Sequence, residues 1–450
     1  MRYEIKVKDK KKSSGNTIRF IGNTSWMMGQ QIYSMVLSLI IGSLTARYLG
    51  PSNYGLINYG ASIISFFTII SKLGLDSVII NEIVKNREKT SSYLGSALTA
   101  RLIVSIASIF IVQGIVIVLE PDNEVLHVVT LLQAFAIVFQ SYEVFQYWFQ
   151  IELKMMFVSI ATMIAMTVTE AWRVVLLATG ASVEFFALSS SIKLGVCGII
   201  VTCIFFSQSK IKLKFSFSDL KYLLARSHHY IISGLAVTLY SQIDKVMIGN
   251  MISSEALGYY TAGSTIACLW EFVPNAFINS ARPLIMEKRE TDYKEYIRRF
   301  QFLLLGITIM AILVGIVVTI FGKLAIWILY GTEYAEAYVP LVIILWSTGF
   351  AMLGTARNIW LVTEDLNSYS KNFTIAGAVI NLAANAIMIP IWGIRGAAIA
   401  TLISQFSVCF IMPWLFKKTR EFNRLYVGAI KRLPEFLKWS MTQLRLMKKN

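Results

Sequence analysis

Nine ionisable residues lie inside long apolar stretches of this sequence, where a membrane-spanning helix would otherwise carry only apolar side chains. They are Arg101, Glu143, Glu170, Arg173, Lys193, Asp244, Lys245, Glu271 and Arg357. A charge near the centre of a bilayer costs roughly +2.5 to +3.5 kcal/mol, so such a residue normally faces a bundle interior or a water-filled cavity. These side chains could bind a charged cargo, bind a coupling ion, or pair to hold helices together. Five are basic and four acidic, so a cavity that they line would be only mildly cationic.

The basic residues of this set are the candidates for contacting an anionic substrate in a cavity: Arg101, Arg173, Lys193, Lys245 and Arg357. Lys193 is the strongest, because it lies near mid-span with no acid within one helical turn of its own helix. Arg101 lies close enough to one end of its span to snorkel toward water instead. Glu170 and Arg173 are three residues apart, so an internal ion pair explains them equally well.

Asp244 and Lys245 are adjacent, so on a helix they point about 100° apart and cannot pair with each other. Asp244 and Glu271 are interpreted as coupling-ion candidates, for a proton or a sodium gradient, although a salt bridge to another helix explains Asp244 equally well. Asn381 and Asn385 are four residues apart and form a polar stripe that we expect at the cavity. Interhelical hydrogen bonding is the commoner explanation of such a stripe.

The residue patterns needed for other chemistry do not occur in the sequence. His127, His228 and His229 fall at the ends of apolar stretches, and the four cysteines lie within such stretches without a CxxC pair. Neither a metal site nor a disulfide framework is therefore predicted. The sequence has no Walker motif or glycine-rich phosphate loop. We expect no catalytic residues, no metal and no cofactor, and a protein that is not an enzyme.

Composition indicates how these residues are positioned. Of 450 residues, 56% are hydrophobic and 15% charged, against a usual charged share of about a quarter. The sequence therefore predicts an all-α integral membrane protein. A span needs about 20 largely apolar residues, and twelve such runs occur, at about 25–46, 54–75, 94–119, 125–149, 156–179, 183–206, 229–251, 256–280, 300–322, 338–362, 371–391 and 395–416.

Lysine and arginine predict the orientation of the chain. Seven lie between Arg2 and Arg19, ten lie between Lys417 and Lys449, and alternate loops carry clusters at 85–89, 210–226 and 288–299. Because cytoplasmic loops of membrane proteins are rich in these residues, both termini are expected in the cytoplasm. The same rule explains the formal net charge of +16 without a nucleic-acid partner.

The longest break between apolar runs divides them into six and six. We predict an N-terminal lobe at 1–206, a cytoplasmic linker at 207–228, a C-terminal lobe at 229–416 and a basic cytoplasmic tail at 417–450. ALGYYTAGSTI (256–266) aligns with NYGLINYGASI (53–63), which predicts two lobes related by pseudo-two-fold symmetry around a central cavity. Apolar residues of the tail recur at helical spacing, which favours a helix on the inner leaflet surface. A frayed tail is an equal alternative, because Pro434 interrupts the pattern.

Four stretches resemble one known family. They are ARYLGPSNYGL (46–56), GLDSVIINEIVKN (74–86), SQIDKVMIGNMISSEALGYYTAG (241–263) and INLAANAIMIPIWGIRGAAIATLISQ (380–405). Together they are similar to the O-antigen type flippases of the multidrug/oligosaccharidyl-lipid/polysaccharide (MOP) exporter superfamily. The resemblance implies two six-helix lobes that open alternately to either side of the membrane.

The same resemblance implies the cargo and its setting. The cargo would be a polyprenyl-pyrophosphate-linked oligosaccharide, moved from the inner to the outer leaflet of a bacterial plasma membrane for surface polysaccharide assembly. Membrane lipids, glycosyltransferases and a polysaccharide polymerase would be its partners, and we expect a monomer. The family offers no invariant ion ligand that maps onto this sequence, so the coupling ion stays open.

Two other functions compete with this interpretation. A drug/cation antiporter of the same superfamily would favour an acidic pocket, whereas the first half carries Arg101, Arg173 and Lys193. A membrane polysaccharide polymerase or ligase would need a sizeable outer loop or acids in an outer turn. The predicted outer turns are short, and Glu120, Asp122 and Glu124 are explained by a solvated turn.

Overall fold

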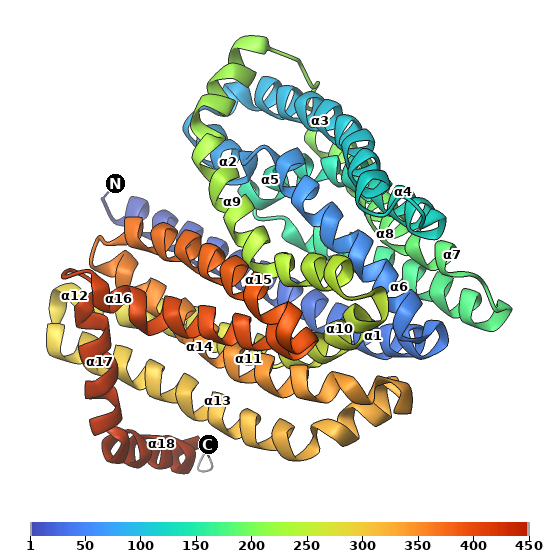
Figure 1. Ribbon diagram of the computed structural model, residues 1–450. Coiled ribbons are helices and arrows are strands. Elements are labelled where there is room, and N and C mark those ends of the chain that lie inside the picture. The colour runs from blue at the N-terminus through green and yellow to red at the C-terminus, as the bar shows by residue number, and fades with distance from the viewer. Residues whose placement is uncertain (1, 448–450) are drawn as a thin grey trace. The chain divides into compact units, whose positions relative to one another are not determined.

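The structure, a computed structural model, describes the backbone of residues 2–447 and the side chains of residues 22–442. The basic side chains of residues 2–19, and those of Arg445, Lys448 and Lys449, lie outside these ranges. All regular secondary structure in the described residues is helical (Figure 1). The helices are α1 (Arg2–Lys72), α2 (Leu75–Lys85), α3 (Thr90–Leu119), α4 (Glu124–Phe139), α5 (Glu143–Ile151), α6 (Met155–Thr179), α7 (Val183–Ala187), α8 (Ser189–Ser209), α9 (Phe217–Met251), α10 (Ser254–Leu269), α11 (Phe272–Met286), α12 (Lys288–Thr291), α13 (Tyr293–Tyr330), α14 (Tyr338–Thr363), α15 (Asn367–Phe406), α16 (Met412–Leu415), α17 (Arg420–Lys431) and α18 (Leu433–Met447).

Nine helical stretches of the described chain are long and apolar enough to cross a membrane. Two of them, Gly22–Lys85 and Asn367–Leu415, each contain a sharp break and so supply two spans. The breaks lie at Gly50 (φ 70°, ψ 170°) and Gly393 (φ 59°, ψ −137°), backbone conformations that favour glycine. A further span is made by α10 and α11, which the turn at Trp270 and Glu271 separates. The twelve predicted spans are thereby confirmed.

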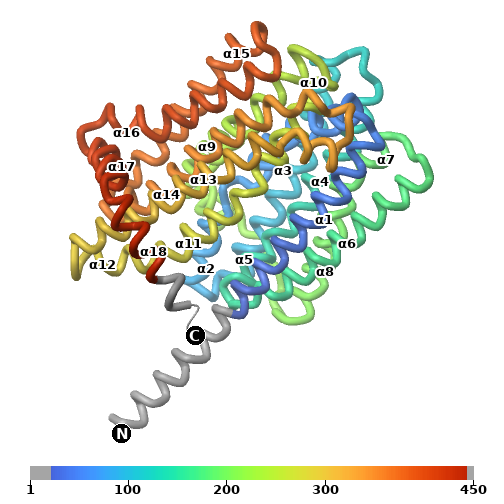
Figure 2. The backbone as a smooth tube through the Cα atoms, turned by 90° about the horizontal axis from the view of Figure 1, so that it is seen from below, coloured from blue at the N-terminus to red at the C-terminus, as the bar shows by residue number. Residues whose placement is uncertain are grey.

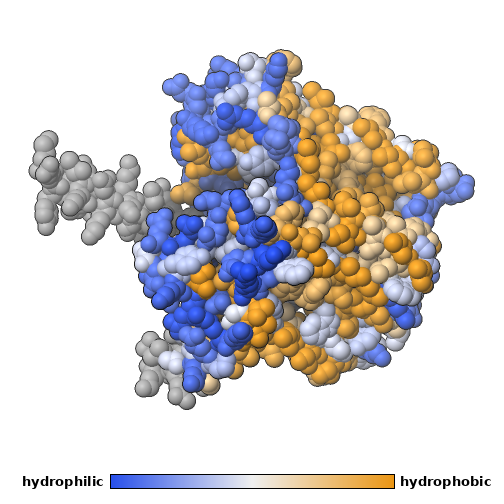
Figure 3. Space-filling view, turned by 60° about the vertical axis from the view of Figure 1, so that its left-hand side comes forward, coloured by the Kyte–Doolittle hydropathy of each residue, from blue (hydrophilic) through white to orange (hydrophobic). Residues whose placement is uncertain are grey.

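The long helices expose apolar side chains on their outer faces. Figure 3 shows hydrophobic residues covering a broad area of one face, with hydrophilic residues gathered toward its edges. On α3, Phe110 is 74% and Val118 is 79% exposed. A soluble protein rarely exposes so large an apolar area, and in a bilayer the same surface is solvated by lipid chains.

The chain forms two compact units that divide within α9, one ending at Thr238 and the other beginning at Leu239. The core of the first unit contains a group of aromatic side chains among aliphatic ones, with the rings of Phe145 and Phe205 stacked at 4.5 Å. The core of the second unit is built on α13 and α14 and includes Phe300 and Trp360. Each unit therefore has its own packed interior.

The predicted linker at 207–228 is structured over most of its length. α9 begins at Phe217, so the expectation of a loop is wrong for its second half. The preceding residues run extended along α3, where the Lys214 N–H donates to the Ser91 carbonyl at 3.2 Å and the Ser216 N–H to Ser96 Oγ at 2.8 Å. A side chain at Gly95 would collide with the Lys214 carbonyl, so the close approach requires glycine.

Two ion pairs hold the start of α9 against the first unit. Arg226 binds Glu82 at 2.8 Å, and Lys89 binds Asp219 at 2.8 Å. The second half of the predicted linker is thus a helix that packs against the first unit. The division of the chain into two lobes at 207–228 stays a prediction.

The predicted tail is helical and packed, and the frayed alternative is wrong for the described residues. α17 buries Phe422, Leu425 and Ala429 against the second unit, and Gln301 Nε2 of α13 donates to the Leu425 carbonyl at 3.1 Å. α17 and α18 close one end of that unit, where α12 also lies (Figures 1 and 2). Pro434 stands in the first turn of α18, where a missing N–H costs no helical hydrogen bond.

Two helix ends, one in each unit, share the same hydrogen-bond pattern. After α5 the N–H of Lys154 donates to the Phe149 carbonyl at 2.8 Å, and after α14 the N–H of Leu366 donates to the Leu361 carbonyl at 2.7 Å. Each turn passes through a left-handed residue, Leu153 (φ 53°) or Asp365 (φ 57°). This is the Schellman motif, in which the left-handed residue that ends the helix is usually glycine. Two non-glycine residues thus take the same sparsely populated conformation.

Candidate functional site

Asp244 is the centre of a buried polar cluster in the second unit. It lies on α9 and is 7% exposed. The Tyr260 hydroxyl of α10 donates to Asp244 Oδ2, and the backbone N–H of Lys245 donates to Oδ1 at 2.8 Å. Within the described side chains, no basic group forms an ion pair with this carboxylate. The alternative explanation, that Asp244 forms a salt bridge to another helix, is therefore not supported within the described side chains.

The polar stripe on α15 continues the cluster. Asn385 Nδ2 donates to Asn381 Oδ1 at 3.1 Å, and Asn381 Nδ2 donates to Thr401 Oγ1 at 3.4 Å. The Thr401 hydroxyl also interacts with the Tyr260 hydroxyl, so a chain of polar contacts runs from Asp244 to Asn385. Asn385 Oδ1 is buried and has no hydrogen-bond partner in the described structure.

The chemistry of this cluster is that of oxygen ligands. It holds one carboxylate, amide oxygens and hydroxyl groups, which are the donors that hard cations prefer. A buried carbonyl oxygen without a donor, as at Asn385, is an unusual cost in a packed interior and calls for an explanation. Among the described residues, no group of three or more His, Cys, Asp or Glu side chains is placed to hold a metal ion. The arrangement fits a proton or a weakly held monovalent cation better than a transition metal.

Glu271 lies in the turn between α10 and α11, near the same cluster. Its carboxylate accepts from the Cys268 thiol, and Cys268 interacts electrostatically with Glu271, Lys245 and Asp244. Glu271 has no ion-pair partner among the side chains that the structure describes. The break in the helix therefore presents a half-buried carboxylate beside the Cys268 thiol.

In the first unit, Lys193 has charged neighbours that the sequence did not reveal. Arg173 and Glu170 of α6 pair at 3.1 Å, and both interact electrostatically with Lys193 of α8. The acid therefore comes from another helix. Glu170 is buried, whereas Arg173 and Lys193 remain partly exposed. The three groups together carry one net positive charge.

Arg101 is enclosed within the first unit, and the snorkelling alternative is wrong. Arg101 is only 1% exposed, and its Nη2 lies 3.5 Å from Asp76 Oδ1 and 3.6 Å from Glu143 Oε2. Lys72 binds the same Glu143 at 3.0 Å. Asp76 and Lys72, on either side of the break between α1 and α2, were not among the predicted site residues. Their position next to Gly74, at a helix break, could have indicated that they are close in space.

Arg357 is likewise enclosed, in the second unit. Its guanidinium donates to the carbonyls of Val408 and Cys409, which belong to a π-helical turn (Ser407–Ile411). The rings of Phe373 and Phe422 lie 4.7 and 5.8 Å from it. Such a turn leaves carbonyls without their usual helical N–H donors, and the Arg357 guanidinium donates to these carbonyls instead. Of the five predicted basic residues, Arg173, Lys193 and Lys245 are the more accessible in their own units.

Comparison with known proteins gives one family and several relatives. The profile of a family described as "Polysaccharide biosynthesis protein" matches residues 20–287. The probable flippase AglR of Haloferax volcanii is 28% identical over 243 residues, which cover 52% of this chain and 49% of AglR. The capsular polysaccharide biosynthesis protein CapF of Staphylococcus aureus is 17% identical over 88% of this chain and 99% of its own length. The putative O-antigen transporter of Escherichia coli K12 is 19% identical over 88% and 96%.

Solved structures share the fold at low identity. The lipid II flippase MurJ in an inward closed conformation aligns with a TM-score of 0.71 and 13% identity, covering 92% of each chain. A multidrug resistance MATE family transporter of the MOP superfamily, in an inward-facing conformation, aligns with a TM-score of 0.62 and 13% identity over 92% of this chain and 96% of the other. These likenesses show that the chain shares the multi-span fold of these proteins.

Proposed function

Because the chain belongs to the polysaccharide biosynthesis protein family, whose members are transporters and not enzymes, we propose that it flips a lipid-linked oligosaccharide. The cargo is a polyprenyl-pyrophosphate-linked repeat unit that moves from the inner to the outer leaflet of a bacterial plasma membrane. Both termini lie in the cytoplasm in this proposal. The protein acts as a monomer between glycosyltransferases, which make the cargo, and a polysaccharide polymerase, which uses it.

The observation that carries this proposal is the family match, which spans more than half of the chain. The partly exposed cations of the first unit add a chemical reason. Arg173 and Lys193 lie close together, and Glu170 neutralises one of their two charges. A pyrophosphate needs such fixed positive groups when it leaves water, and arginine binds phosphate oxygens in a bidentate manner. The lipid chain can meanwhile remain in the bilayer.

Two lobes related by pseudo-two-fold symmetry would open alternately around a central cavity. The paired glycines Gly55 and Gly258, and the matching turns at Leu153 and Asp365, support an internal repeat. Lys245 completes the basic set that we assign to cargo binding, whereas Arg357 is buried against the carbonyls of Val408 and Cys409. Arg101 would serve chiefly to hold the first lobe together, because it is enclosed by carboxylates.

Coupling to an ion gradient is proposed at Asp244. The carboxylate is buried and forms no ion pair within the described residues, and Asn381 and Asn385 extend its oxygen-rich surroundings. A proton or sodium ion bound there would neutralise the charge and favour one conformation, since a ligand shifts a two-state equilibrium by its differential affinity. Glu271 is the second coupling candidate.

Transport by purified protein in proteoliposomes tests the proposal. A polyprenyl-pyrophosphate oligosaccharide with a fluorescent sugar should lose its protection from an external quencher when the protein is present. The same polyprenol bearing the sugar without pyrophosphate should move much more slowly. Gradient-driven efflux of a cationic dye, without movement of the lipid-linked sugar, would instead favour the drug/cation antiporter.

A further inference from the structure

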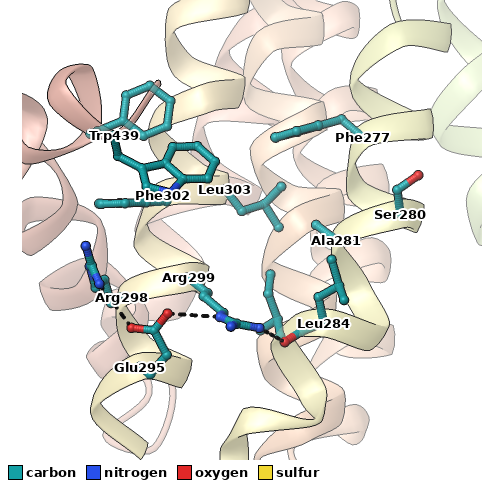
Figure 4. Close-up of a pocket in the computed structure, with 12 residues that line it drawn as sticks. Phe277, Ser280, Ala281, Leu284, Glu295, Arg298, Arg299, Phe302, Leu303 and Trp439 are labelled. Atoms are coloured by element: carbon teal, nitrogen blue, oxygen red, sulfur yellow. Dashed lines mark hydrogen bonds and ion pairs between the residues drawn. The ribbon is translucent and has the colours of Figure 1, made fainter. Parts of the chain in front are cut away.

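A pocket of about 460 Å³ lies in the second unit, between α11, the start of α13 and α18. Its two ends differ in chemistry. Figure 4 shows Glu295, Arg298 and Arg299 together at one end, and the rings of Phe277, Phe302 and Trp439 at the other. The pocket is outside the Asp244 cluster and is lined by none of the residues assigned above to cargo or ion binding.

Aromatic rings from three helices form the apolar end. Phe302 packs edge-on against Phe436 at 5.4 Å and lies 5.6 Å from Trp439. Gly306, one turn further along α13, lets Phe277 and Phe436 approach the helix, because a Cβ there would lie 3.2 Å from the Phe277 ring. Phe277 is 42% and Trp439 43% exposed, so this apolar lining is accessible from outside the unit.

Two arginines at the other end retain hydrogen-bond donors. Arg298 Nη1 donates to Glu295 at 3.3 Å, and its Nε lies 2.8 Å from Glu435 Oε1 in an ion pair without hydrogen-bond geometry. Arg299 uses Nε on Glu295 at 3.0 Å and Nη1 on the Leu284 carbonyl at 2.8 Å. Each guanidinium carries five N–H donors, and the Nη2 group of each has no partner within the described residues. Each arginine thus keeps an Nη2 group that can donate to an anion at this end of the pocket.

The charges around this end do not cancel completely. Arg432 also pairs with Glu435, at 3.7 Å, so three arginines face two carboxylates. An anion at this end of the pocket would therefore neutralise the excess charge. Glu295 lines the pocket between Arg298 and Arg299 and accepts hydrogen bonds from both (Figure 4).

We propose that this pocket binds an anionic phospholipid, with its phosphate on Arg298 and Arg299 and an acyl chain against the aromatic rings. An occupant must be amphiphilic, because a free phosphate would leave the aromatic end unfilled and a neutral lipid would leave the Nη2 donors unused. Basic pockets between membrane helices on the cytoplasmic side take anionic headgroups in this way. The predicted orientation puts the start of α13 at the inner leaflet, where anionic lipids are supplied.

Bound lipid would also link α18 to α11 and α13, which lie far earlier in the sequence. Phe436 and Trp439 belong to α18, whereas the opposite wall belongs to α11. The lipid therefore helps to hold the C-terminal helix against the second unit. Thermal stability then reports lipid binding without any measurement of transport.

The test uses the full-length purified protein with phosphatidylglycerol or phosphatidylcholine, followed by native mass spectrometry and thermal unfolding. We expect phosphatidylglycerol to be retained about tenfold more than phosphatidylcholine and to raise Tm, since hydrogen bonds to charged groups contribute this much. R298Q/R299Q should abolish the preference. S280W, at an exposed position of the lining, should block lipid by filling the pocket with the charges intact.

The matched control is R424Q, which removes an exposed arginine of α17 outside the pocket. It should retain the full preference for phosphatidylglycerol. Equal retention of the two lipids by the wild-type protein would overturn the proposal, as would equal losses in R424Q and the pocket variants. A Tm rise of the same size with inorganic phosphate, or a preference for polyprenyl phosphate without one for phosphatidylglycerol, would also overturn it.

Discussion

Arg87 Nη1 lies 2.9 Å from Glu152 Oε1, which joins the turn before α3 to the turn after α5. The second unit contains the same relationship, in which Arg289 of α12 binds Glu364 after α14 at 3.2 Å. In both units the carboxylate directly precedes the left-handed residue of the helix-ending motif. Each pair therefore fastens two loops at one end of its own unit.

The loop-fastening pair gives a first prediction. R87E should lower Tm, because it places two carboxylates together, and R87E/E152R should recover most of the loss. Both side chains are partly exposed, so we expect a coupling free energy of only about 0.5 to 1 kcal/mol. Thermal unfolding of the four proteins of the double-mutant cycle measures it. R424E, at a pair exposed on both sides, is the control. Additive effects of the two reversals would contradict the prediction.

Arg101 gives a prediction about stability. R101M should destabilise the protein by about 1 to 3 kcal/mol. Glu143 would lose one of its two cationic partners, whereas the half-exposed Asp76 can be solvated by water. R101K should not restore stability fully, since one ammonium cannot match the guanidinium geometry. Denaturation in detergent measures the loss, and R226M, at a pair with an exposed arginine, serves as the comparison. A loss below about 1 kcal/mol would show that the network is not structural.

Lys193 gives a prediction about transport. K193A should impair export of the surface polysaccharide while the folded protein accumulates normally, because a partly exposed cation is lost from the group with Arg173 and Glu170. Complementation of a deletion strain, with the amount of membrane protein measured in parallel, tests this. K221A, at an exposed position of α9, should have no effect. Wild-type export from K193A would remove Lys193 from the proposed site.

Asp244 gives a prediction about coupling. D244N keeps the shape of the side chain but removes its charge, so transport should lose its dependence on the ion gradient and fall about tenfold or more. Flipping in proteoliposomes with imposed sodium or proton gradients separates the two ions. D122N, in the turn between α3 and α4, is the matched control. Undiminished gradient-driven transport by D244N would exclude Asp244 as the coupling group.

The number and position of the spans could be predicted because bilayer thickness fixes the length of an apolar run. The partners of the charged residues could not be predicted from the sequence, because these partners belong to other helices. Lys193 has no acid on its own helix, yet Glu170 reaches it from α6. Asp76 lies outside the apolar runs, and Tyr260 resembles any other aromatic residue in the sequence until its hydroxyl is seen to donate to Asp244.

The predicted linker at 207–228 shows that helix boundaries, too, could not be predicted from local sequence. A polar, basic segment between apolar runs favours a loop, whereas Arg226 and Asp219 make it a helix by pairing with Glu82 and Lys89. These pairs depend on residues more than a hundred positions away. Local composition carries no information about them.

The hydrogen bonds from Lys214 and Ser216 to α3 have a mechanical consequence. The segment before α9 is held by these hydrogen bonds and is not a flexible linker. Any large change in the orientation of the C-terminal half would therefore require α9 to bend beyond Arg226, because the segment at Lys214–Ser216 cannot extend.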